Sequence, residues 1–174
     1  LGLPSRLHVD EFVDGGGLQL ASELGAISGD HVGHSSESAR QSASDSGVMQ
    51  TFLPGTPYIL GHDLETPLTQ CIENKWAFSL ATDFNPNCRT LSMPFVGSLA
   101  THRLGLSPME ALVTVTRNPS TTLLNSTEGE VTGSIREGGP ADLLILDSPY
   151  IDSWCQMPGD NPIYKTVKSG TIVN

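Results

Sequence analysis

The stretch RLHVDEFVDGGG, residues 6–17, holds one histidine, three carboxylates and three consecutive glycines. Residues 5–9 have the composition of a short buried strand, and the glycines indicate a loop after it. Because side chains on a strand alternate between its faces, His8 and Glu11 can point to the same place only if the strand ends near Val9. The stretch therefore predicts a strand whose carboxyl end carries reactive side chains.

Working outward from this stretch, strands and helices alternate along the first part of the chain. Near-continuous apolar strands separated by helices indicate a parallel sheet covered on both faces, which is an α/β fold. The predicted order is strand 5–9, helix 16–26, strand then loop 26–34, helix 35–47, strand 48–54, helix 64–75 and strand 76–83.

The alternation of predicted strands and helices ends after residue 83. Helices are predicted at about 91–104, at 107–116 and in the segment PSTTLLN, and Ser107 with Glu110 forms a capping-box pattern. From residue 128 the sequence is rich in turns and typical of a small sheet. We therefore predict two parts, a parallel βα unit over residues 1–124 and a β segment over residues 125–174.

Composition narrows the class of partner. The 174 residues include 9 basic and 19 acidic side chains, a net charge of −10, which argues against nucleic acid or an anionic membrane as partner. No apolar run approaches 18 residues, and no signal peptide is recognisable. The three cysteines are far apart and odd in number, which fits neither a disulfide framework nor a zinc ribbon and suits a reducing cytoplasm.

Polar side chains recur where the predicted strands end. His8 ends the first strand, Asp30 and His31 end the second, and Asp83 ends the fourth. Each alone is more often a structural histidine or a helix cap. In a parallel βα array, however, all carboxyl ends of strands lie on one side, which is where active sites form, so their coincidence predicts one site. The other histidines, His34, His62 and His102, show no such placement.

These residues lie in motifs that resemble the amidohydrolase superfamily and, within it, the imidazolonepropionase family. The pattern T-x-N-P-S followed by a G-x-I segment ending in ADLLILD is typical of the whole superfamily. The H-x-D-E-F motif with DH and TDFNP is much narrower, and the resemblance runs from about residue 3 to the end. The segments that carry it are LHVDEF, ELGAISGDHVGH, LATDFNPN, MPFVGSLATHRLGLSPMEALVTVTRNPS and GSIREGGPADLLILD.

The resemblance implies the C-terminal half of a (β/α)8 TIM-like barrel, strands five to eight, followed by part of a small composite β domain. It also implies one Zn or Fe ion, held by an H-x-H pair from the first strand, a histidine from the fifth and an aspartate from the eighth. By this resemblance His8 and Asp83 are the metal ligands. Glu11, His31 and Asp83 are the implied catalytic residues, and Glu11 also contacts substrate.

The same resemblance implies that Asn85, Asn87 and Cys88 bind substrate. The family turn reads NPG followed by a small hydroxyl residue, so Asn87 and Cys88 depart from it, and the lost glycine could hinder close approach of the backbone to a ligand. The H-x-H pair does not occur in these 174 residues. We therefore expect the chain to be the C-terminal part of a longer enzyme and to be inactive, or nearly so, alone.

The implied reaction is hydrolysis of 4-imidazolone-5-propanoate to N-formimidoyl-L-glutamate in histidine degradation. The expected partner is this small molecule, the expected location is the cytoplasm, and the full-length enzyme is expected to be a homodimer. Imidazole and carboxylate ligands accept Zn or Fe. Two alternatives stay open, namely another amidohydrolase, such as a deaminase of a cyclic amidine or nucleobase, and a catalytically inert half-barrel or scaffold.

Overall fold

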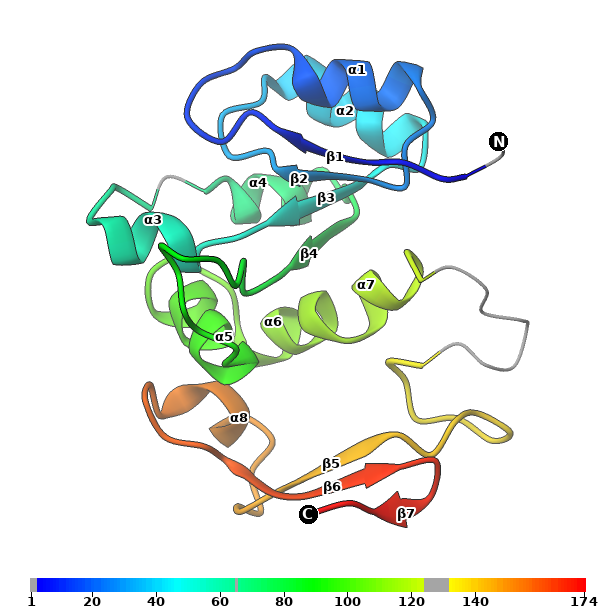
Figure 1. Ribbon diagram of the computed structural model, residues 1–174, viewed down its shortest axis with the longest axis vertical. Coiled ribbons are helices and arrows are strands. Elements are labelled where there is room, and N and C mark those ends of the chain that lie inside the picture. Colours follow the sequence, from blue (N-terminus) through cyan, green and yellow to red (C-terminus); the bar gives the residue numbers. More distant parts are fainter. Residues whose placement is uncertain (1–2, 65, 124–131) are drawn as a thin grey trace.

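The computed structural model describes residues 3–64, 66–123 and 132–174. Its first part is an α/β unit whose four strands are parallel and lie in chain order (Figure 1). The predicted parallel sheet is therefore confirmed, although each strand is shorter than its apolar segment. The strands are β1 (Arg6–Val9), β2 (Ser28–His31), β3 (Met49–Phe52) and β4 (Phe78–Leu80).

The register of the first two strands fixes where their carboxyl ends lie. His8 is level with Asp30, and Val9 is level with His31. Because the strands run in the same direction, the segments that follow Val9 and His31 leave the sheet at the same edge. The side chains that were predicted to lie at the carboxyl ends of these strands therefore lie at this edge.

Two helices, α1 (Gly17–Glu23) and α2 (Glu37–Asp45), pack together on one face of this sheet (Figure 1). They bury an apolar core that includes Leu18 and Phe52. Helix α4 (Leu68–Glu73) lies within the segment 64–75 that was predicted to be helical, but α3 (Gly55–Leu60) was not predicted. Proline is tolerated in the first turn of a helix, so the prolines at 54 and 57 do not prevent α3 from forming.

Three helices follow β4, namely α5 (Met93–His102), α6 (Pro108–Val115) and α7 (Arg117–Ser120). The predicted capping box at α6 is confirmed, since Ser107 and Glu110 exchange both hydrogen bonds. Helix α7 begins before the predicted segment PSTTLLN, whose last two residues lie outside the described residues. Within the described part of the chain, no helix is both long and apolar enough to cross a membrane.

The C-terminal segment forms a separate antiparallel sheet of β5 (Leu143–Leu146), β6 (Ile163–Lys168) and β7 (Thr171–Ile172). Ser169 and Gly170 both adopt left-handed backbone angles in the β6–β7 turn, as a tight hairpin requires. The predicted small sheet is thus confirmed. The proposed boundary between residues 124 and 125 falls outside the described residues and stays a prediction.

A short helix, α8 (Ser153–Gln156), joins the C-terminal segment to the helices after β4. It packs on α5, where the Ser98 hydroxyl donates a hydrogen bond of 2.6 Å to the carbonyl of Cys155. The indole of Trp154 is buried and donates to the carbonyl of Pro108 at 3.0 Å. Gly97 lets this indole approach, because a Cβ there would lie 2.2 Å from the ring.

We predict that Gly97→Ala destabilises the protein by about 2 kcal/mol, because the added methyl overlaps the Trp154 ring. The gain in helix propensity, at most about 1 kcal/mol, does not offset this overlap. Urea unfolding followed by tryptophan fluorescence measures the change. Gly33→Ala is the control, since nothing lies within 4 Å of a Cβ at Gly33. Equal stability of the two variants would contradict the proposed packing of α8 on α5.

Candidate metal-binding and catalytic site

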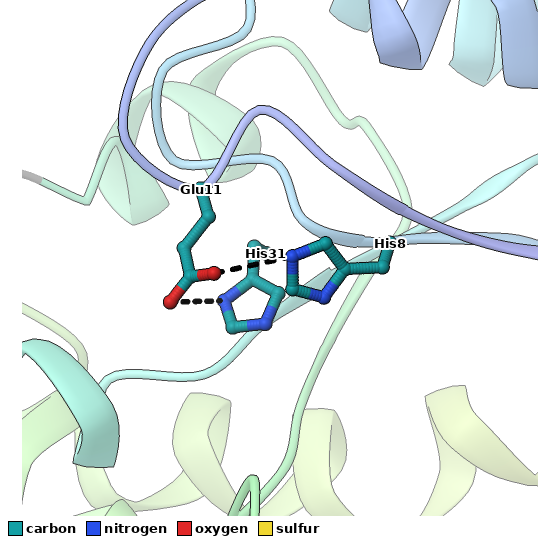
Figure 2. Close-up of side chains that lie close together, drawn as sticks. All are labelled: His8, Glu11 and His31. Atoms are coloured by element: carbon teal, nitrogen blue, oxygen red, sulfur yellow. Dashed lines mark ion pairs between the residues drawn. The ribbon is translucent and has the colours of Figure 1, made fainter. Parts of the chain in front are cut away.

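The first site residues lie where β1 ends. The strand stops at Val9, and Asp10 turns the backbone into the left-handed region at φ 52°. Glu11 is thereby brought back toward His8, with 3.1 Å between His8 Nε2 and Glu11 Oε2 (Figure 2). This is the early strand ending on which the predicted approach of His8 and Glu11 depended.

The turn after β1 is held by the buried carboxylate of Asp10. Its oxygens accept hydrogen bonds from the amides of Gly15, Gly17 and Leu18 and from the hydroxyl of Ser35. Burial alone would raise the pKa of Asp10, but these hydrogen bonds outweigh it and lower the pKa below its usual value. Sequence reasoning gave this residue no role, since its partners meet only in the folded chain.

His31 is the last residue of β2, as predicted, and its side chain is nearly buried. Its Nδ1 lies 3.8 Å from Glu11 Oε1, and its ring meets that of His8 edge to face at 4.4 Å between centroids (Figure 2). Burial lowers the pKa of His31, although the Glu11 and Asp83 carboxylates act in the opposite direction. The lowered pKa favours the neutral form of the imidazole.

Asp83 joins the same group, although β4 ends three residues earlier, at Leu80. It adopts a left-handed φ of 53°, and its Oδ2 lies 3.9 Å from His31 Nε2. The buried hydroxyl of Thr56 donates a hydrogen bond to the same oxygen. Thr56 was missed because it lies on α3, a helix that the sequence did not predict.

The donors present fit a divalent transition-metal ion. His8, Glu11 and His31 each offer one ligand atom, and these atoms lie within 4.8 Å of one another. Asp83, the other predicted ligand, is not part of this group and lies beside it, next to His31. Imidazole nitrogen and carboxylate oxygen are the ligands that Zn and Fe take in catalytic sites. The His8 side chain is 68% exposed, so its ring is open to further groups from outside this part of the fold.

The turn at residues 85–88 lies just beyond Asp83. The Asn85 amide donates to the carbonyl of Asp83 at 2.8 Å, and its Oδ1 accepts from the amides of Asn87 and Cys88. Asn87 is exposed and does not adopt a left-handed conformation, so the departure from glycine causes no backbone strain. Cys88 is fully buried, and its thiol lies 3.4 Å from the carbonyl of Thr82.

A pocket of about 310 Å³ adjoins the group, and Glu11 and His31 form part of its wall. His34 and His62 also line it, and His62 meets the ring of Phe12 edge to face. Neither histidine was expected to lie at a strand end, and neither does, but both contribute to the wall of this pocket. The strand pattern therefore gave no signal for them, whereas His102 is exposed at the end of α5.

Comparison with curated proteins identifies relatives along nearly the whole chain. Imidazolonepropionase of Halobacterium salinarum is 35% identical over 98% of this chain, and that of Symbiobacterium thermophilum is 36% identical over 99%. The chain is a relative of the imidazolonepropionases. It spans only 42% and 40%, respectively, of the length of these two proteins. No protein-family model matches the chain.

Solved structures with this fold include enzymes of other activities. Ochratoxinase of A. niger superposes with a TM-score of 0.75 at 20% identity, over 97% of this chain and 41% of that enzyme. A zinc-bound adenosine deaminase from Xanthomonas campestris superposes with a TM-score of 0.76 at 16% identity, over 98% and 45%. At these identities the likeness establishes the fold alone, and it confirms an α/β architecture that matches less than half of each of these two enzymes.

The Asp10 carboxylate should make stability depend on acid pH. Because folding lowers the pKa of Asp10, the ionised carboxylate contributes fully to the stability of the fold above the unfolded pKa of about 4. This stabilisation is lost as the pH falls through the lower native pKa. We predict that Asp10→Asn destabilises by about 1–3 kcal/mol at pH 7 and by much less at pH 2. Urea unfolding at the two pH values tests this, with the exposed Asp45→Asn as control. A penalty unchanged by pH would contradict it.

Proposed function

We propose that this chain forms part of an imidazolonepropionase, which hydrolyses 4-imidazolone-5-propanoate to N-formimidoyl-L-glutamate. The observation that supports this most directly is the meeting of His8, Glu11, His31 and Asp83 at one edge of the parallel sheet. The relatives at 35–36% identity support the choice of substrate within this fold. The pocket beside Glu11 and His31 is large enough for a ligand of this size.

We assign His8 and Asp83 as metal ligands, acting with an H-x-H pair contributed from outside these 174 residues. A catalytic site normally has at least three protein ligands, and the chain spans about two-fifths of its curated relatives. When bound, a Zn or Fe ion supplies a polarised carbonyl and a water of lowered pKa. The exposure of the His8 ring is consistent with further ligands on that side.

Glu11 and His31 then transfer a proton or donate a hydrogen bond to the substrate. Asp83 accepts a proton from the attacking water, and Glu11 relays this proton to the ring nitrogen that leaves, so that both carboxylates are regenerated. The two oxygens of Glu11 face His8 and His31 respectively, which fixes the carboxylate between them. The neutral imidazole of His31 can donate a hydrogen bond to the developing carbonyl oxygen without adding charge to the site.

Asn85, Asn87 and Cys88 are proposed to bind substrate as one turn. The Asn85 side chain organises this turn through its bonds to Asp83, Asn87 and Cys88, and Asn87 is the exposed member. The Cys88 side chain faces the protein interior, so its contribution to a ligand is through the backbone.

The four parallel strands are proposed to be strands five to eight of a (β/α)8 barrel, within a unit spanning residues 1–124. Among the described strands, β1 and β4 are the outermost strands of this sheet, each paired on one side only, whereas in a closed barrel every strand is paired on both sides. The antiparallel sheet then forms part of the composite β domain within residues 125–174. The isolated chain, lacking further strands and ligands, is expected to be inactive.

We predict that Glu11→Gln or His31→Asn, made in the enzyme that contains this chain, lowers kcat for 4-imidazolone-5-propanoate by about 10²–10⁴-fold. Each change removes a group that moves or holds a proton. Ring opening followed by ultraviolet absorbance provides the measurement, and His102→Asn, at an exposed histidine at the end of α5, is the control. Guanine and a cyclic amidine serve as competing substrates, and preferential turnover of either one would refute the proposed substrate.

The ligand assignment predicts different metal contents for different variants. His8→Ala and Asp83→Asn should lower the affinity for Zn at least about tenfold, and Glu11→Gln should lower it less than either of them. Competition with a chromogenic chelator measures the affinity in the same enzyme. If Glu11→Gln loses metal as readily as His8→Ala, Glu11 is itself a ligand and the division of roles is wrong.

A further inference from the structure

Arg40 lies in the middle of α2, where the sequence predicts a polar helix, yet only 1% of it is exposed. Its guanidinium lies over the ring of Phe52, at 5.3 Å from the centroid. Burial lowers its pKa, but an arginine keeps its charge across the working range of an enzyme. A buried charge is retained only where hydrogen bonds compensate for its lost hydration.

The partners of this guanidinium lie in the segment that follows β2. Nη2 donates to the carbonyls of both Val32 and Gly33, the latter at 3.2 Å. Nη1 donates to the side chain of Gln50 at 3.1 Å, and Gln50 in turn donates to the carbonyl of Arg40. Arg40 is thus anchored to its own helix and to β3, and it holds the two residues that come directly after His31.

The segment that Arg40 holds has an unfavourable backbone conformation. His31 and Val32 are consecutive residues in the left-handed region, at φ 80° and φ 46°. That region is sparsely populated by residues other than glycine, and a β-branched residue such as valine is an outlier there. Such a conformation persists only where the surroundings over-determine it, and the two carbonyl bonds from Arg40 supply part of that restraint.

We propose that Arg40 is a positioning residue for His31. By holding the carbonyls of Val32 and Gly33, it keeps the backbone in the turn that directs the His31 ring toward Glu11, Asp83 and His8. It touches neither substrate nor metal. The proposal depends on the proposed function only where it links the position of His31 to turnover, because the position itself can be measured without metal or substrate.

The test compares Arg40→Met, Arg40→Gln and Arg40→Lys in the 174-residue chain and in the enzyme that contains it. Methionine keeps apolar bulk without donors, whereas lysine has three N–H donors for the same three acceptors. Ala43→Gly, on a buried position of the same helix, is the control for general destabilisation. The probe is the nuclear Overhauser contact between the ring protons of His8 and His31, whose centroids lie 4.4 Å apart.

We expect Arg40→Met to lose this ring contact and to lower kcat about 10–100-fold with little change in KM, as do other residues that orient a functional side chain. Arg40→Lys should keep the contact and most of kcat, and Ala43→Gly should keep both. Urea unfolding ranks the stability of all variants.

Retention of the ring contact in a folded Arg40→Met or Arg40→Gln would overturn the proposal. So would failure of both variants to fold while Ala43→Gly folds, because Arg40 would then serve the fold alone. If the contact is lost in Arg40→Met while even the parent enzyme does not turn over 4-imidazolone-5-propanoate, the positioning role stands and the proposed function fails.

Discussion

The site depends on the carboxylate of Asp10 and the hydrogen bonds that it accepts. One oxygen binds the amides of Gly15 and Gly17, and the other binds Leu18 and Ser35. The first three are donors at or near the start of α1, and the fourth comes from the loop after β2. One buried charge therefore fixes two loops against each other. Glu11, the next residue, owes its position beside His8 to the turn that Asp10 makes.

The sheet supplies the long-range part of the same arrangement. Parallel register puts Val9 level with His31, so the turns that begin after these residues leave the sheet together. Asp10, His31 and Asp83 all have positive φ although none is glycine. Side chains that would otherwise follow the alternation of a strand are turned toward one another. Such costly conformations concentrate at functional sites because the fold around them over-determines the backbone.

The sequence predicted what depends on local pattern. The order of strands and helices, the capping box at Ser107 and the approach of Glu11 to His8 follow from periodicity and spacing along the chain. Prediction from the sequence failed where the contacting residues are far apart in the chain, and where a short helix forms in a segment whose residues do not favour one. Thr56 lies on α3, which the prolines concealed, and α8 has only one turn. Sequence reasoning gave Arg40 no role, since two of its three acceptors are backbone carbonyls that carry no sequence signal.

The loop after β2 is held from two sides by ions of opposite sign. Arg40 donates to the carbonyls of Val32 and Gly33, while Asp10 accepts from the hydroxyl of Ser35 with its side chain and from the amide of His34 with its backbone carbonyl. The Asp10 carboxylate also favours the charged form of Arg40. Apolar packing is not directional, whereas these bonds fix two carbonyls, one amide and one hydroxyl on four consecutive residues. The His31 ring lies between two carboxylates, those of Glu11 and Asp83, and holding it in that position requires such directional support.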